Sequence, residues 1–444
     1  MRPTAPLPLV LGLVACSGAS DNAAEEFSVR DSAGVEIVHN GATGVVSQAA
    51  LDSPRMTLRI GQREGAPEYQ HFRLSGMAIA PSGEIHVVDA GHAEVRVFDG
   101  EGRYLRTYGH QGQGPGEFEF PTSVWLRGDT VTVYDGELSR MTLFDRGGRV
   151  LDTWRVGGSR TGHLGPLGTA PGGWIVAPSR YGRWPYEPGV VRRDTARIAF
   201  VSAFEAAVEA YETVLDTSPP ETESPGESTS AIRHIIAYPR GRMMGVSTPM
   251  TMTATDPLFE PQPRYAVDGR GRVHFSPADT YVVETYTPDG RLVRRLSREY
   301  EAVPVTSELV DRFRDRARAY WDTASTAGER VLGKANDEAR AGMDHVETLP
   351  PIGRMYASND GALWVERIDL VADPLELEWQ RPPPPPRETK WDIFDPAGRF
   401  LGTATLPPKF SPRLVGDRWV LGVLRDDLDV QYVARFEIGD GPAR

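Results

Sequence analysis

The chain has 444 residues, of which 40% are hydrophobic and 25% are charged. This composition is typical of a globular protein and excludes a largely disordered or membrane-spanning chain. The formal net charge of −12 argues against nucleic acid and anionic lipid headgroups as partners. The 46 glycines and 37 prolines favour many short strands and turns over a helical fold.

The first sixteen residues predict a signal peptide. Residues 7–14 are an apolar run that is too short to span a bilayer but has the length of a signal-peptide core. The run ends in Leu-Val-Ala-Cys16, which resembles the lipobox of bacterial lipoproteins, and Cys16 is the only cysteine of the chain. The resemblance implies that Cys16 is lipidated, and Ser17 after it implies an anchor in the outer membrane, facing the periplasm. The alternative is a plain secretory signal with an incidental cysteine.

Residues 17–30 are small and polar at first, and we expect a flexible tether there, followed by one folded unit over residues 31–440. Within that unit, residues 95–108 alternate apolar and polar side chains around a turn with two glycines, which predicts a hairpin. Residues 109–118 contain four glycines and a proline. They predict an irregular crossing loop that ends by placing Phe118 in a core.

This hairpin recurs along the chain. A Gly-Arg turn, four residues after an aromatic side chain, appears at Gly102, Gly148, Gly290 and Gly398. A glycine that opens a short apolar strand appears six times, and the first three copies are 45 residues apart. A period of about 45 residues made of short strands is typical of a propeller blade. Six blades are therefore predicted from the marker glycines Gly83, Gly128, Gly173, Gly271, Gly361 and Gly416.

The loop Gly-Gln-Gly-Pro-Gly-Glu-Phe at residues 112–118 resembles the loops of NHL-repeat propellers, and the chain resembles bacterial lipoproteins described only as six-bladed β-propellers. The resemblance implies an all-β fold of four-stranded antiparallel blades. The last repeat lacks its outer strand, so we expect the N-terminal strand at residues 56–61 to close the ring. Residues 35–38 could add an edge strand, and the sequence leaves the partner of that strand open.

Long insertions fall near residues 195–261, 301–350 and 367–390. In a propeller these positions lie on the face of the b–c and d–a connections, where a to d number the strands of a blade from the inside outwards. One-sided insertion predicts a binding face, although harmless drift of loop length is the alternative. Residues 306–343 predict a helix between blades four and five, capped by Thr306. It could pack on a blade edge or cover the channel.

The sequence shows none of the common catalytic motifs, and its nine histidines form no pair at metal-ligand spacing. We therefore predict no cofactor and expect His86 and His274, at similar places in their blades, to serve packing. Arginines open three consecutive inner strands, near the inserted face, and could attract an anion there. Each could instead pair with an acidic residue of a neighbouring blade. The candidate ligand-binding residues are Arg264, Arg354 and Arg413, with Trp184 and Tyr186 as a possible wall.

Two functional hypotheses follow. The first is a non-catalytic, lipid-anchored, monomeric protein of the bacterial cell envelope that binds an envelope protein or a small anionic ligand on the inserted face. The second is a metal-dependent hydrolase or lyase, similar to the lactonases and amidating lyases that share the propeller architecture. Those enzymes place carboxylates or histidines on several inner strands, whereas the inner strands predicted here carry arginine and serine. The sequence therefore favours the binding protein over the enzyme.

Overall fold

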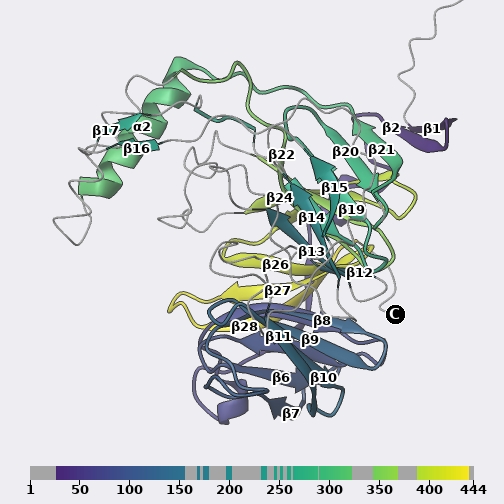
Figure 1. The fold of residues 1–444 in the computed structure, drawn as a ribbon. Helices are drawn as coiled ribbons and strands as arrows, with labels where there is room; N and C mark the ends of the chain where they lie inside the picture. Colours follow the sequence, from purple (N-terminus) through teal and green to yellow (C-terminus); the bar gives the residue numbers. More distant parts are fainter. Residues whose placement is uncertain are drawn as a thin grey trace, which may run out of the picture.

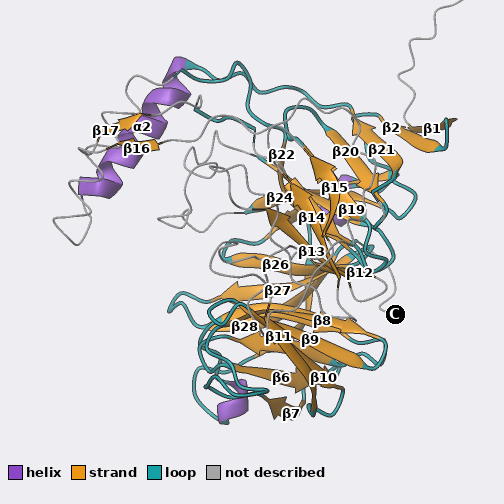
Figure 2. Cartoon of the chain, viewed as in Figure 1, coloured by secondary structure: helices purple, strands orange, loops and turns teal. Residues whose placement is uncertain are grey.

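The computed structural model describes a chain built mostly of short strands (Figure 1), with few helices (Figure 2). The described residues are 27–155, 168–170, 174–179, 197–202, 232–237, 245–247, 251–253, 258–261, 264–288, 290–322, 344–368 and 388–439. Cys16, Trp184 and Tyr186 lie outside them. None of the helices in these ranges is long and apolar enough to cross a membrane.

Two sheets near the N-terminal end are the antiparallel units that the repeat predicts. In each, four strands follow in chain order and pair with their neighbours. Gly102 closes the turn of the predicted hairpin: its N–H donates to the Asp99 carbonyl, and its φ of 83° suits glycine. The strands are β4 (Leu74–Ile79), β5 (Ile85–Asp89), β6 (Glu94–Phe98), β7 (Tyr104–Tyr108), β8 (Pro121–Arg127), β9 (Thr130–Asp135), β10 (Arg140–Asp145) and β11 (Val150–Arg155).

Two sheets at the C-terminal end follow the same pattern, and the second takes its fourth strand from the N-terminal part. β3 pairs with β28 in antiparallel register, from Glu437↔Arg55 to Val433↔Ile60. The predicted pairing of the N-terminal strand with the last repeat is therefore present. The strands are β22 (Ile352–Ala357), β23 (Leu363–Arg367), β24 (Thr389–Phe394), β25 (Phe400–Leu406), β26 (Phe410–Val415), β27 (Trp419–Arg425), β28 (Gln431–Glu437) and β3 (Arg55–Ile60).

A six-stranded sheet contains the fourth predicted blade and two added strands. β2 lies beside β21 in parallel, from Glu36↔Arg294 to Asn40↔Arg298, which settles the partner of the edge strand. The flexible tether predicted over residues 17–30 is wrong for its last four residues, because β1 begins at Phe27 and forms a hairpin with β2. The strands are β1 (Phe27–Ser32), β2 (Val35–Asn40), β18 (Arg264–Val267), β19 (Val273–Ser276), β20 (Val282–Tyr286) and β21 (Leu292–Arg298).

The strands of the third predicted blade depart from the antiparallel pattern. β13 pairs with β14 in parallel, and β14 pairs with β15 in parallel. Parallel neighbours need a connection of a dozen or more residues, and the connections 180–196 and 203–231 are long enough. The strands are β12 (Gly168–Ala170), β13 (Trp174–Ser179), β14 (Arg197–Ser202), β15 (Ile232–Ala237) and, as a separate pair, β16 (Gly245–Ser247) and β17 (Thr251–Thr253).

The other five sheets stand side by side through their innermost strands. β18 contacts β22, β22 contacts β26, β26 contacts β4, and β4 contacts β8. An apolar cluster fills each of the four junctions between these sheets. Phe118, at the end of the crossing loop, is fully buried in the cluster between the sheets β4–β7 and β8–β11, as predicted. The arrangement arises because each sheet is apolar on both faces and is stable only between neighbours.

Residues 35–60 form a belt along the outer strands of three sheets. After β2, Asn40 accepts a hydrogen bond from Phe400 N–H (2.8 Å) and donates one to the Gly398 carbonyl (2.9 Å). The short helix α1 (Gln48–Leu51) then contacts β25, and the chain enters β3. The belt therefore joins the fourth repeat to the last two.

The predicted helical insertion contains α2 (Ser307–Asp322), which lies between β21 and β22. Its N-terminus is capped as expected, because Leu309 N–H donates to Thr306 Oγ1 (3.2 Å). In Figure 1, α2 stands apart from the labelled sheets of β18–β25. Leu309, Val310 and Phe313 pack with neighbours in the insertion, such as Leu349, and with Phe259 of the segment before β18. The described contacts of α2 thus form a small separate core.

Candidate functional site

The strand registers put one position of each innermost strand at the same level. In each of β4, β8, β22 and β26, the innermost strand has one more residue than its partner strand between two consecutive ladder pairs, which is a β-bulge. In β18 the same level is found from His274, which pairs with Ala266 as His86 pairs with Ala78. The equivalent residues, which we call the channel row, are Gly76, Ser123, Arg264, Arg354 and Arg413.

The predicted arginines therefore occupy equivalent places on three adjacent strands, β18, β22 and β26. Arg354 forms a two-point ion pair with Glu366 of β23: Nε lies 2.7 Å from Oε2 and Nη2 lies 2.7 Å from Oε1. Its side chain is still 44% exposed. Partial burial works to lower the pKa of Arg354, but the hydrogen bonds and charge of Glu366 outweigh it and raise this pKa. Arg354 therefore pairs with an acidic residue of its own sheet, not of a neighbouring blade as the alternative predicted.

Arg264 shares this carboxylate. Burial lowers the pKa of Arg264, the negative charge of Glu366 opposes this shift, and the positive charge of Arg354 adds to it. The Arg264 Nε atom is buried and has no hydrogen-bond partner among the described residues. Two guanidinium groups and one carboxylate leave a net positive charge at this end of the row.

Arg413 is held by main-chain carbonyls. Its Nε donates to the Ser75 carbonyl of β4 (2.9 Å), and its Nη1 donates to the Pro412 carbonyl (2.9 Å). Ser75 Oγ in turn donates to the Pro121 carbonyl of β8 (3.0 Å). These hydrogen bonds link neighbouring innermost strands at the level of the channel row and fix the place of Arg413 without neutralising its charge.

A hollow lies between the last sheet and the first. We call it the seam pocket; its volume is about 550 Å³. It is formed by the crossing loop from β3 to β4, the β5–β6 turn and the β27–β28 turn. No sequence motif predicted it. Its lining residues are Gln62, Arg63, Gln70, His71, Phe72, Arg73, His92, Arg425, Leu428, Asp429, Val430 and Gln431.

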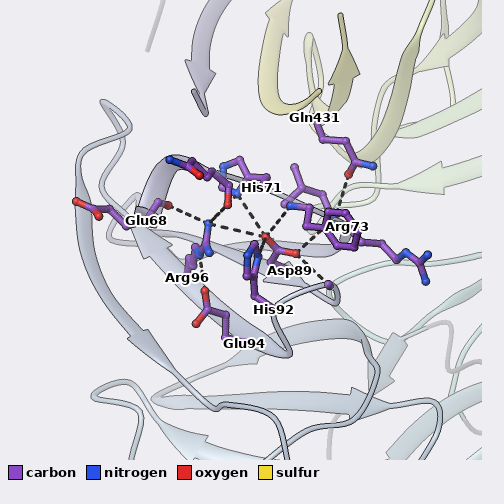
Figure 3. Close-up of polar contacts among 12 residues, drawn as sticks. Glu68, His71, Arg73, Asp89, His92, Glu94, Arg96 and Gln431 are labelled. Carbon is purple, nitrogen blue, oxygen red and sulfur yellow. Dashed lines mark hydrogen bonds and ion pairs between the residues drawn. The ribbon is translucent and has the colours of Figure 1, made fainter. Parts of the chain in front are cut away.

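Asp89, at the end of β5, organises the wall of the seam pocket (Figure 3). It is fully buried and accepts hydrogen bonds from Phe72 N–H (3.1 Å), Arg73 N–H (3.0 Å) and His92 Nδ1 (2.9 Å). Burial works to raise the pKa of Asp89, but these hydrogen bonds outweigh it and hold this pKa below its usual value. Asp89 is therefore an ionised carboxylate at neutral pH.

The next sheet contains an equivalent buried aspartate. A comparison of the two shows which contacts of Asp89 are common to both sheets and which belong to the first sheet alone. Asp135 ends β9 and accepts hydrogen bonds from the N–H groups of its own crossing loop and from Leu138 N–H. His92 stands where that sheet has Leu138, because the following residues, Ala93 and Ser139, share a positive φ of 55° and 47°. The buried aspartate is thus a loop anchor in both sheets, and His92 is particular to the first.

An arginine fixes the crossing loop in both sheets. Arg96 Nη1 donates to the carbonyls of Glu68 (3.2 Å) and Gln70 (2.6 Å), and Arg140 in the next sheet donates to the Gln113 and Glu117 carbonyls. A length difference could have signalled the pocket. Arg73 lies four positions after the loop residue Tyr69, whereas Phe120 in the next sheet lies only two positions after the equivalent Phe118.

Within the residues that the structure describes, no three His, Cys, Asp or Glu side chains are grouped so that they could hold a metal ion. His86 and His274 are buried in their sheets and bond Tyr108 Oη (3.0 Å) and Thr285 Oγ1 (3.1 Å). Both are parts of the core, as expected.

Solved structures with a similar course of the chain have low sequence identity to it. They include a protein from Bacteroides fragilis that is described as exported, with 10% identity, a TM-score of 0.46 and coverage of 91% of this chain and 100% of that one. A DUF4221 protein from Bacteroides vulgatus has 9% identity, a TM-score of 0.43 and coverage of 88% and 100%. A virginiamycin B lyase from Staphylococcus aureus has 9% identity, a TM-score of 0.37 and coverage of 87% and 100%.

No curated protein matches the sequence. Residues 77–156, which hold most of β4 to β11, match the model of a family described as a 6-bladed β-propeller. Over these residues, the match confirms the predicted resemblance to six-bladed β-propellers.

Proposed function

We propose that the protein is a non-catalytic binding protein, a six-bladed ring that holds an anionic ligand at the channel row. The supporting observation is that Arg264, Arg354 and Arg413 occupy equivalent places on adjacent innermost strands. Glu366 balances one of the three charges, and the described hydrogen bonds of Arg413 go to carbonyl oxygens. A guanidinium group presents several N–H donors in one plane, which suits carboxylate and phosphate groups.

Citrate tests this proposal, because it presents several carboxylates to a cluster of arginines. At low ionic strength we expect saturable binding by calorimetry, and we expect Arg264→Gln or Arg413→Gln to weaken it about tenfold or more, the usual cost of one charged hydrogen bond. Arg354→Gln is a poorer test because it removes the two-point ion pair of the buried Glu366 carboxylate.

Arg149→Gln is the matched control, because Arg149 is exposed in a turn on the other face and pairs with Asp145. Circular dichroism should show all variants folded. Absence of citrate binding at millimolar concentration, or equal affinity in both channel variants and the wild type, would overturn the proposal. A stoichiometric metal in the purified protein would instead favour the hydrolase or lyase.

We further infer that the protein is a lipoprotein of the bacterial envelope, with its binding face towards the membrane. Phe27 pairs with Asn40, and Asn40 pairs with Arg298, after which the chain enters the long insertion 299–350. The first described residue therefore lies on the inserted face. Ten residues, 17–26, separate it from Cys16 and span at most ~35 Å when extended.

Replacing Cys16 tests the anchor. In a Gram-negative host we expect the wild type in the outer-membrane fraction and Cys16→Ser in a soluble or inner-membrane fraction, because the variant cannot accept the lipid. Ser17→Ala is the control and should stay membrane-bound. Equal fractionation of wild type and Cys16→Ser would contradict the lipoprotein assignment.

A further inference from the structure

We propose that the seam pocket is a second binding site, which takes a small organic anion with an apolar body. The seam pocket is distinct from the channel row. It is lined by connections between strands of the first and last sheets, and none of the three channel-row arginines is among its lining residues. Its volume of about 550 Å³ lies within the range of small-molecule sites.

The pocket exposes two large apolar side chains from two different sheets. Phe72 is 68% exposed and Leu428 is 62% exposed. Phe72 is held in place: its ring stands edge-on to His92 (6.4 Å between ring centres) and lies against Gly91, where a Cβ atom would come within 2.2 Å of it. Apolar surface that is fixed and exposed in a hollow favours contact with an apolar ligand.

Cationic groups surround these apolar side chains. Arg425 pairs with Asp429 at 3.1 Å, but Arg63 and Arg73 form no ion pair with any carboxylate of the described residues. Arg73 lies over the Phe120 ring, 5.4 Å from its centre, and Figure 3 shows its side chain extending away from Asp89. Two uncompensated guanidinium groups at one hollow select for an anionic group on the ligand.

His92 adds a hydrogen-bond acceptor. Its side chain lines the pocket and is 44% exposed. An ionised carboxylate only accepts hydrogen bonds, so Asp89 requires the proton of a neutral His92 to sit on Nδ1. The Nε2 atom is then an acceptor, and an amine or hydroxyl group beside the anionic group of the ligand would complete its bonding.

The fluorescent probe 8-anilinonaphthalene-1-sulfonate combines fused rings, a secondary amine and a sulfonate. We expect the full-length protein to bind one probe molecule with enhanced fluorescence, and we expect Phe72→Ser and Arg63→Gln each to weaken binding about tenfold. Both side chains are exposed, so the melting temperature should stay within a few degrees.

Matched controls replace exposed residues elsewhere in the same sheet: Leu105→Ser, at 44% exposure, and Arg103→Gln in the β6–β7 turn. Both should bind the probe like the wild type. Equal affinity of Phe72→Ser, Arg63→Gln and the wild type would overturn the seam-pocket proposal. The citrate measurement is independent, because Arg264→Gln and Arg413→Gln should leave probe binding unchanged.

Discussion

A chain that starts at residue 61 should fail to fold to a stable monomer. The deletion removes the belt and β3, which exposes the edge of β28 and removes the buried side chains of Val38, Leu51 and Ile60. Each buried aliphatic side chain contributes about 1.5–3 kcal/mol, so the three together contribute about 5–9 kcal/mol. This loss is comparable with the ~5–15 kcal/mol that stabilises a typical domain. Gel filtration and circular dichroism should show aggregates or an unfolded chain.

A shorter deletion is the control for this experiment. A chain that starts at residue 35 loses only β1, whose last four residues are exposed and whose other edge is free in the sheet order. We expect the chain that starts at residue 35 to remain monomeric and to have a melting temperature within a few degrees of that of the untruncated chain. A folded monomer from the chain that starts at residue 61 would show that β3 and the belt are dispensable.

Acidification from pH 7 to pH 5 should destabilise the protein markedly. Burial lowers the pKa of His86 from 6.5 to about 4, and the charge of Arg106 adds to this shift. Burial likewise lowers the pKa of His71 from 6.5 to about 4, with Arg96 as the next cause. The unfolded chain takes up a proton near pH 6.5, whereas the folded protein does so only near pH 4. Stability is therefore fully present above pH 6.5 and falls as the pH drops towards 4.

The expected loss at pH 5 is about 2 kcal/mol for each of the two histidines, from the difference between the folded and unfolded pKa values. Urea unfolding at pH 7 and pH 5 measures it. His86→Gln should reduce the pH-dependent loss by about 2 kcal/mol, because glutamine does not titrate. The control is His110→Gln, since the His110 side chain is 73% exposed. An unchanged pH dependence in His86→Gln would contradict the assigned pKa shift.

The repeat made much of the fold predictable. The Gly-Arg turns and marker glycines lie in short hairpins, whose geometry depends on local residues, so their spacing places the strands of four sheets. The missing strand of the last repeat also pointed correctly to β3. The parallel place of β2 beside β21 carries no such signal, because no turn joins strands some 250 residues apart. The parallel pairs of β13–β15 were missed for the same reason.

The channel row was partly predictable from the sequence, whereas the seam pocket was not. Arg264 and Arg354 stand seven residues before their marker glycines, so a constant strand register placed them at one level. The hydrogen-bond partners of the arginines could not be predicted. Glu366 contacts Arg354 from the neighbouring strand, and Ser75, which accepts from Arg413, lies 338 residues away in the sequence. The seam pocket is lined by Phe72 and Leu428 from the two sides of a junction between the first and last sheets, which residues so distant in sequence do not reveal.

By itself the sequence determined the blade unit and the pairing of β3 with the last sheet, because both depend on spacing within or between local hairpins. Only the tertiary structure decided which charges are neutralised in the channel row and where the belt runs. It also brought residues 62–73 and 425–431 together around one hollow. These features depend on contacts between segments that are distant in sequence, whose side chains meet only when the sheets are packed side by side.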